Sequence, residues 1–310
     1  MALRSTVPKE KPAMTRRQRH DLLAGLGFGA PILLGFLLFS IMPMLISLYY
    51  SFTNLELVNK PELIGLANYR ALFSGSDPYF YRSLSVTLYY CALAIPMNIV
   101  FAFAMAMLLN QSVRGRSIFR TIFYLPSIVP AVASSMIWIF LMDPSLGALN
   151  NLLSLVGLPT CRWIFAEASV IPSLALMSNW SVGATMIIFL AGLQDVPRQL
   201  YESAEIDGAG FFIKLFHITI PMMSPTIFYN LIMCIIGGMQ SFTQAYVMTG
   251  GGPNNASLFY AYYLYRQAFA FSKMGSASAI AWVLFALIAL LTLLAFRSAK
   301  RWVYYEGAGK

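Results

Sequence analysis

Charge is scarce in this chain. Only 11% of its 310 residues are charged, whereas 58% are hydrophobic, and the mean hydropathy is +0.67. Ordinary soluble domains contain about a quarter charged residues, and they need them to cover their surface. The 21 Lys and Arg and 12 Asp and Glu side chains are too few to coat a soluble globule of 34.5 kDa. The composition excludes a soluble enzyme, a secreted disulfide scaffold and a disordered chain, and it predicts a membrane protein.

Cysteines and the familiar catalytic motifs are also few or missing. There are three cysteines, an odd number, and Cys91 and Cys234 fall inside hydrophobic runs, which argues against a disulfide framework. The chain has no Gly-x4-Gly-Lys-Ser/Thr phosphate loop, so it lacks the usual means of binding ATP. Its two histidines, His20 and His217, are far apart in the sequence, which argues against a His-based metal site. We therefore expect no catalytic residue, no cofactor and no metal.

The charged residues are clustered, and long uncharged gaps separate the clusters. These gaps run between residues 21–56, 82–114, 120–143, 167–195, 214–266 and 273–297. Each can hold a membrane-spanning helix, which needs about 20 apolar residues. The fifth gap predicts one span, from about 218 to 248, because Gly250 to Pro253 breaks any helix and the aromatic segment 258–265 is too short to cross. The pattern predicts an all-α integral membrane protein with six spans.

The distribution of Lys and Arg predicts the orientation. With the N-terminus inside, the inner segments carry 15 of the 21 basic residues, so both termini are expected to be cytoplasmic. The predicted organisation is a basic N-terminal segment (1–21), a transmembrane domain (22–300) and a cytoplasmic tail (301–310). The basic start resembles a signal peptide, but the apolar run continues to Tyr50 without a small-residue cleavage pattern, which favours an uncleaved first helix. Because the basic residues flank apolar spans, they indicate anionic lipid headgroups rather than nucleic acid as their partners.

No span carries an ionisable residue midway, and one inner loop has charge of the wrong sign. A proton-driven carrier usually needs intramembrane ionisable groups. Residues 195–214 contain four acidic and two basic side chains, the reverse of the other inner segments. Pro197 and the helix formers after it predict a short helix, Gly208 ends it in a tight turn, and a second helix is expected from Ala209. These helices are expected to lie parallel to the membrane face; the simpler alternative is a solvated loop with a glycine cap.

The same loop resembles a family signature. Glu202-Ser203-Ala204, three residues, Gly208, nine residues and Ile218-Thr219-Ile220-Pro221 resemble the EAA motif of ABC-transporter membrane subunits. The family pattern is Glu-Ala-Ala-x3-Gly-x9-Ile-x-Leu-Pro, from which this chain departs at Ser203 and Ile220. The extended form, with Asp207, Ala209 and an upstream proline, is similar to the sugar-importer branch of the maltose and glycerol-phosphate type. Segments 65–73, 115–126, 143–150 and 249–253 also resemble that branch, and the resemblance covers roughly residues 22–300.

The resemblance implies a type I importer permease fold and a coupling loop at 195–217. In such proteins the loop docks in a cleft of a cytoplasmic ATPase subunit, and closure of two ATPase subunits turns the membrane helices outward. The residues expected to make this contact, through carboxylates, small side chains or apolar anchors, are Leu200, Tyr201, Glu202, Ser203, Ala204, Asp207, Gly208, Ala209 and Phe211.

The resemblance also implies partners and a solute. They are a second homologous permease subunit, expected to form a heterodimer rather than a homodimer, two ATPase subunits, an extracytoplasmic solute-binding protein and a carbohydrate. An uncharged polyol is bound through hydrogen bonds and aromatic faces. The side chains of these types in the later spans are Asn179, Trp180, Tyr229, Asn230, Gln240 and Gln244. Aromatic belts and helix–helix hydrogen bonds also use such residues.

Two other classes of protein are weighed against the importer. A stand-alone secondary carrier or channel for a small polar solute is the main alternative, and the missing midway charges and the EAA-like loop argue against it. A membrane enzyme acting on lipids needs clustered Asp, His or Ser groups at one face, and the sequence shows no such cluster. The expected location is a bacterial-type inner membrane.

Overall fold

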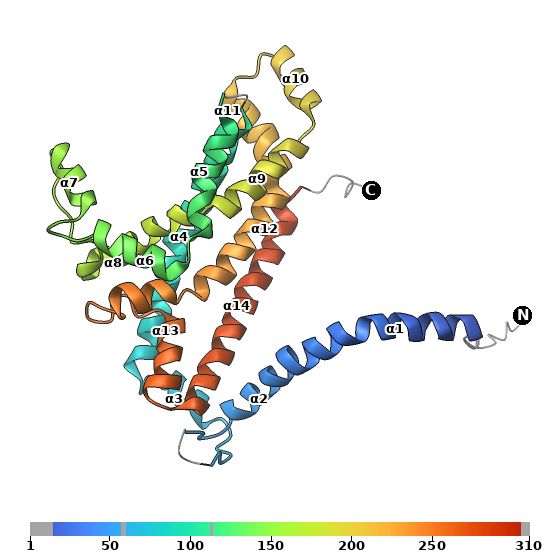
Figure 1. The fold of residues 1–310 in the computed structure, drawn as a ribbon, viewed down its shortest axis with the longest axis vertical. Helices are drawn as coiled ribbons and strands as arrows, with labels where there is room; N and C mark the ends of the chain where they lie inside the picture. Colours follow the sequence, from blue (N-terminus) through green and yellow to red (C-terminus); the bar gives the residue numbers. More distant parts are fainter. Residues whose placement is uncertain (1–14, 57–59, 112–113, 305–310) are drawn as a thin grey trace, which may run out of the picture. The chain divides into compact units, whose positions relative to one another are not determined.

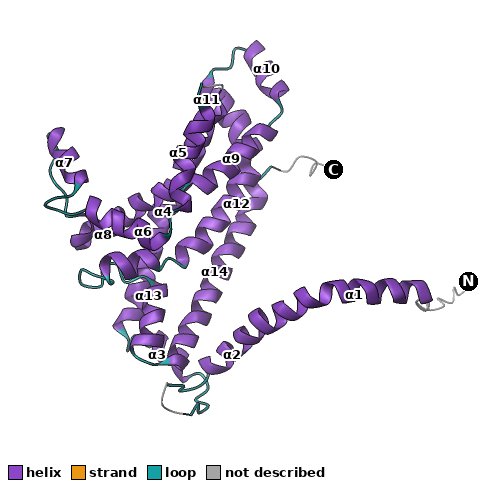
Figure 2. Cartoon of the chain, viewed as in Figure 1, coloured by secondary structure: helices purple, strands orange, loops and turns teal. Residues whose placement is uncertain are grey.

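The protein is described here from a computed structural model covering residues 15–56, 60–111 and 114–304. Most of these residues are helical, and the part of the chain described contains no β-strand beyond one isolated bridge between Thr53 and Leu63 (Figure 2). The prediction of an all-α chain is therefore confirmed. The start of the basic segment 1–21 and the end of the predicted tail 301–310 lie outside the described residues.

The chain divides into two units, residues 1–50 and 51–310. The first unit contains one long apolar helix, built from α1 (Arg16–Phe36), a π-helical turn (Leu37–Ile41) and α2 (Met42–Ser51). Thr15 caps its start, because its hydroxyl accepts from the Gln18 N–H and the Gln18 side chain accepts from the Thr15 N–H. Its most apolar 18-residue stretch has no buried residue.

Helix α4 forms the centre of the second unit. Short helix α3 (Ala67–Phe73) precedes it, and the Asp77 carboxylate accepts from the Tyr79 N–H to begin α4 (Pro78–Asn110). Helix α4 packs against α8 (Glu167–Ser178), α9 (Gly183–Asp195), α12 (Ile220–Met239) and α13 (Tyr260–Tyr265). The last helix, α14 (Met274–Trp302), packs against α12 and α13. Small residues allow this close packing: Ala94, Ala102 and Ala106 on α4 are buried.

Two hydrophobic clusters form the core of the second unit. One gathers the first half of α4 with α8, α13 and α14, and its largest fully buried side chains include Tyr260, Tyr263 and Phe80. The other gathers the second half of α4 with α9 and includes Phe189 and Met223. The Asp77 carboxylate joins helices here as well, because it accepts from the Tyr263 hydroxyl at 2.6 Å and from Gln267 Nε2 at 3.2 Å.

Two predicted spans are sharply bent. Helices α5 (Arg116–Ile128) and α6 (Ala131–Leu141) meet at 100°, and the α8 segment meets α9 at 54°. Among the described residues, four helices are long and apolar enough to cross a membrane alone, and the count reaches the predicted six if each bent pair is one span. The fifth predicted span also differs: the helix runs from Phe211 to Met239, so it begins before residue 218 and ends before 248. After Gln240 the chain forms a separate π-helical turn, Ala245–Thr249.

Candidate coupling helix and solute pathway

The acidic inner loop folds as a helix, a glycine turn and a second helix. Helix α10 (Arg198–Ile206) begins directly after Pro197, at the end of the second unit opposite α3 (Figure 1). Gly208 adopts a φ of +77°, which lets the Gly208 N–H reach the Glu205 carbonyl at 3.0 Å and the Ala209 N–H reach the Ala204 carbonyl at 2.8 Å. Helix α11 (Phe211–Lys214) then leads through a π-helical turn (Leu215–Thr219) into α12.

The second helix starts two residues later than predicted. The sequence suggested a start at Ala209, but the Ala209 N–H closes the turn onto Ala204, and Gly210 is extended with ψ at 175°. Ala209 therefore belongs to the turn and is not available as the first residue of the second helix. An ion pair links the two helices that flank the turn, with Lys214 Nζ 2.8 Å from Glu205 Oε1. Because the Glu205 side chain is 63% exposed, we assign this pair no more than about 1 kcal/mol.

Tyr201 faces its own chain. It was expected to anchor a partner, but its ring is partly buried against the cluster of α4 and α9, and its hydroxyl lies 3.0 Å from Thr219 Oγ1. Thr219 is itself buried and donates to the Lys214 carbonyl at 3.2 Å. Tyr201 thus ties α10 to the start of α12.

Removing the Tyr201 hydroxyl is expected to loosen this tie. Tyr201→Phe keeps the ring packing and deletes one hydrogen bond, which is worth about 1 kcal/mol. Amide hydrogen exchange across residues 198–206 should become several-fold faster, while exchange in α4 stays unchanged. Tyr229→Phe, at a tyrosine that is 50% exposed, serves as the control. Equal exchange in both variants would show that Tyr201 does not hold the helix.

The outer face of the loop is apolar and acidic. Phe211 is 56% exposed on this face, whereas Leu200, which is 41% exposed, lies on the side of α10 that faces α12. Ile206 is 87% exposed and was missed, although an apolar residue between Glu205 and Asp207 is a signal that the sequence contained. The other predicted contact residues Glu202, Ser203, Asp207 and Gly208 are exposed, whereas Ala204 and Ala209 are half-buried.

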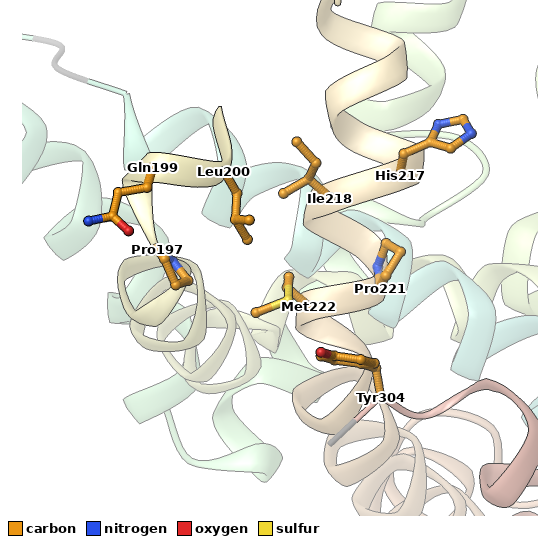
Figure 3. Close-up of a pocket in the computed structure, with 8 residues that line it drawn as sticks. All are labelled: Pro197, Gln199, Leu200, His217, Ile218, Pro221, Met222 and Tyr304. Atoms are coloured by element: carbon orange, nitrogen blue, oxygen red, sulfur yellow. The ribbon is translucent and has the colours of Figure 1, made fainter. Parts of the chain in front are cut away.

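A cavity of about 480 Å³ separates α10 from the start of α12 (Figure 3). Leu200 and Met222 point into it from its two sides, whereas His217 points away (Figure 3). Tyr304 lines the same cavity, and its N–H donates to Ser224 Oγ at 2.8 Å. Tyr304, just beyond α14, is thereby fastened to α12 beside the loop, and α10 has unfilled space beneath it.

A second cavity, of about 370 Å³, is lined by uncharged polar groups. Asn98 on α4 and Ser178 on α8 face each other in its wall, with the Ser178 hydroxyl donating to Asn98 Oδ1 at 3.2 Å. Beyond α12, the Ser241 hydroxyl donates to Gln244 Oε1 at 3.0 Å. Amide and hydroxyl groups of this kind can hydrogen-bond an uncharged solute such as a polyol. The lining residues include no charged side chain; its polar members are Tyr90, Asn98, Ser178, Ser181, Thr185, Gln240, Ser241, Thr243 and Gln244.

The structure separates the six predicted solute residues. Gln240 and Gln244 line the polar cavity. Asn179 and Trp180 line a different, largely apolar cavity of about 690 Å³. Tyr229 is exposed and lines none of these three cavities, and Asn230 is buried with its Nδ2 donating to the Thr226 carbonyl of its own helix at 2.9 Å. The structure therefore brings the two glutamines together in the polar cavity and places Asn179 and Trp180 in the apolar one.

Several polar residues of the cavity were not foreseen. They come from α4, the α8–α9 bend and the segment after α12. Serines and threonines in membrane helices commonly bond carbonyls of their own helix, as Ser178 does to Ala175 at 2.6 Å. Their presence in a hydrophobic run therefore carries no signal for a cavity, and only the bend at Val182 brings them together.

Comparison with known proteins matches this architecture. Residues 98–303 match the family model described as the inner membrane component of binding-protein-dependent transport systems. The probable ABC transporter permease YesP of Bacillus subtilis is 41% identical over 94% of this chain and 95% of its own length. The arabinooligosaccharide transport permease AraP of the same organism is 33% identical over 87% and 86%, and the glycerol-3-phosphate transport permease UgpA of Yersinia pestis is 32% identical over 84% and 88%.

A solved structure has the same fold. A chain of a bacterial ABC transporter involved in importing the acidic polysaccharide alginate superimposes with a TM-score of 0.80, at 24% identity, over 92% of this chain and 99% of that one. The sequence relatives extend over most of the chain, and the family model covers the helix–glycine–helix loop and most of the polar cavity. This chain therefore belongs to the family of inner membrane components of binding-protein-dependent transport systems.

Proposed function

We propose that this chain forms half of the translocation pathway of an ATP-driven importer for an uncharged carbohydrate, and that α10 couples it to a cytoplasmic ATPase. The observation that carries the proposal is the α10–Gly208 turn, an acidic, exposed element tied through Tyr201 to the start of α12. Such an element can accept movement from a partner and pass it to a helix next to the polar cavity.

The proposed ATPase contact combines charge with apolar anchors. Glu202 and Asp207 offer exposed carboxylates to cationic groups, and Gly208 lets a partner's backbone approach closely. Ile206 and Phe211 supply exposed apolar side chains, the kind of group that gains most from burial at the centre of an interface. We assign the main apolar contact to these two residues rather than to Tyr201.

The proposed solute is a neutral carbohydrate. Relatives with solutes in their names transport arabinooligosaccharides or glycerol 3-phosphate, and the structural neighbour imports an acidic polysaccharide. A phosphorylated or acidic solute calls for cationic side chains, and the polar cavity has none among its lining residues. A second, homologous permease subunit is expected to complete the pathway, as a heterodimer rather than a homodimer, together with two ATPase subunits.

An extracytoplasmic binding protein is the expected source of the solute. A related alginate transporter has been solved in complex with a pentasaccharide-bound periplasmic protein. With both termini cytoplasmic, as the basic residues predict, the segment from Gly250 to Ser257 faces the extracytoplasmic side. Glu167 Oε1 accepts from Asn254 Nδ2, and Asn255 accepts from Arg82, so this segment is held in place by two elements.

Cross-linking tests the proposed coupling contact directly. Ile206→Cys, assembled with an ATPase subunit that carries one cysteine in the cleft proposed to receive α10, should form a disulfide with that subunit when a copper oxidant is added. The yield should change when ATP is added. Leu146→Cys, an equally exposed position at 86%, is the control and should not cross-link to the ATPase. An assembly that purifies with an ATPase but never cross-links through Ile206 would contradict the role of α10.

Replacing Gln244 tests the polar cavity. Gln244→Leu leaves Ser241 without its acceptor and removes an amide from the cavity, so we expect solute uptake at subsaturating concentration to fall about tenfold. Tyr229→Phe, outside the cavity, should transport normally. Uptake in proteoliposomes measures both. Equal uptake by the two variants would remove the cavity from the pathway.

A further inference from the structure

Two arginines at the start of α5 lie side by side without an acidic partner. Arg116 and Arg120 are one turn apart, and both are half-buried against α9. With the Gln194 amide oxygen facing them, Gln194 Oε1 accepts from Arg116 Nη2 at 2.9 Å and from Arg120 Nη2 at 3.2 Å. Two guanidinium groups that share one acceptor repel each other, and that repulsion favours the binding of an anion.

Within the described chain, no acidic side chain neutralises this positive charge. Among the residues that the structure describes, no carboxylate oxygen lies within 4.0 Å of either guanidinium. The Nε atoms of both arginines are buried and have no hydrogen-bond partner. Helix α5 also begins at Gly115 without a capping side chain, so its positive N-terminal end adds to the same field. Three independent features therefore leave positive charge uncompensated at one place.

An apolar cavity opens on the same helix, one turn further on. The cavity of about 690 Å³ is lined by Ile122, Phe123 and Pro126 of α5, and Phe123 is three residues, about 4.5 Å of helix rise, from Arg120. The other side is formed by α4, where Val100 is 67% exposed and Phe101 43%. No charged residue lines the cavity. Its open, apolar wall suits a hydrocarbon chain.

We propose that Arg116 and Arg120 bind the phosphate of an anionic phospholipid whose acyl chain lies in the cavity between α4 and α5. Arginine binds phosphate oxygens in a bidentate manner, and basic pockets between membrane helices are known recognition sites for anionic headgroups. The order along α5 also fits, because the apolar residues that line the cavity, beginning with Ile122 and Phe123, follow Arg120. A lipid with its negative charge at one end and its chain at the other matches both features together.

Lipid retention by the full-length chain tests the proposal. The chain is delipidated in detergent and titrated with phosphatidylglycerol or phosphatidylcholine of identical chains, and bound lipid is counted by native mass spectrometry. The wild type is expected to bind phosphatidylglycerol about tenfold or more tightly than phosphatidylcholine. Arg116→Gln/Arg120→Gln should abolish this preference. Arg114→Gln/Arg162→Gln removes the same charge from two exposed positions and should keep it.

Further experiments distinguish binding of the lipid phosphate from binding of the acyl chain. Ala104→Phe fills the cavity while leaving the arginines in place, and it should weaken the retention of both lipids. Millimolar inorganic phosphate should not displace phosphatidylglycerol, because it lacks the chain. The proposal is overturned if the double arginine variant keeps the preference, if free phosphate displaces the lipid completely, or if Ala104→Cys cross-links to a second permease subunit that fills the cavity without lipid.

Discussion

Gly208→Asp is expected to abolish transport while the chain still inserts into the membrane. Gly208 has a φ of +77°, where a side chain costs about 1–2 kcal/mol, but a Cβ there would meet no atom within 4 Å. The fold should therefore survive. A charged side chain would instead stand on the surface that the ATPase must approach. Loss of one central contact of this kind costs 2 kcal/mol or more, so we expect uptake to fall at least ~30-fold.

Two control variants separate the strain from the surface effect. Gly208→Ala imposes a similar backbone strain without charge or length, and it should cost only about 1 kcal/mol, a few-fold in uptake. Gly210→Ala lies two residues on, with an ordinary φ of −70° and no atom within 4 Å of its Cβ, and it should behave as the wild type. The readouts are ATP-dependent uptake and the ATPase that purifies with the chain. Normal transport by Gly208→Asp would remove this turn from the coupling mechanism.

Gly183→Ala is expected to lower the stability of the fold strongly. A Cβ at Gly183 would lie 2.6 Å from the Phe123 carbonyl oxygen and 2.8 Å from Tyr124 Cα, both backbone atoms of α5. Because neither can rotate away, α5 and α9 must separate. Overpacking of this kind costs about 1–3 kcal/mol, and we expect the upper part of that range. Both cavities beside Val182 would open with it, since Val182 lines each of them.

Gly192→Ala on the same helix is the matched control. Its Cβ would meet Thr226 Oγ1 at 2.9 Å and Met223 Cε at 3.0 Å, which are side-chain atoms that can move. Thermal unfolding in detergent should therefore place Gly183→Ala well below Gly192→Ala, with less monodisperse protein recovered. Equal unfolding temperatures would show that the crossing of α5 and α9 is looser than the structure describes.

The inner loop could be predicted because its chemistry is local. Pro197 fixes the start of α10, and Gly208 supplies the left-handed turn that ends it, so both boundaries follow from single residues. The predicted start of the second helix at Ala209 was wrong because a hydrogen bond from the Ala209 N–H to the Ala204 carbonyl competes with the new helix. Such competition between two acceptable conformations leaves no mark in the sequence.

The bends in the spans could not be predicted in the same way. Pro126 and Pro130 lie in the third uncharged gap, but prolines inside membrane helices are often tolerated as mild kinks. Charge counting therefore could not distinguish a mild kink from the 100° bend between α5 and α6. The polar cavity depends on a similar bend at Val182, and for that reason Asn98 and Ser241, which line it, escaped notice.

The solute candidates show where residue type stops being informative. Gln240 and Asn179 are both amides in predicted spans, yet one lines the polar cavity and the other lines an apolar one. Gln240 and Asn179 differ in the face of the helix bundle on which they lie. The packing of α4, α8, α9 and α12 determines that face. The site at Arg116 and Arg120 also depends on packing, because Gln194 lies between the two side chains only where α9 packs against α5.

Reconstituted transport tests the central claim most directly. The chain, its partner permease, the ATPase subunits and the binding protein are placed in proteoliposomes, and entry of a neutral labelled oligosaccharide is followed with and without ATP. Uptake should require ATP, the binding protein and an intact Gly208 turn, and it should be insensitive to an imposed proton gradient. Uptake by this chain alone, or uptake driven by the proton gradient without ATP, would contradict the account.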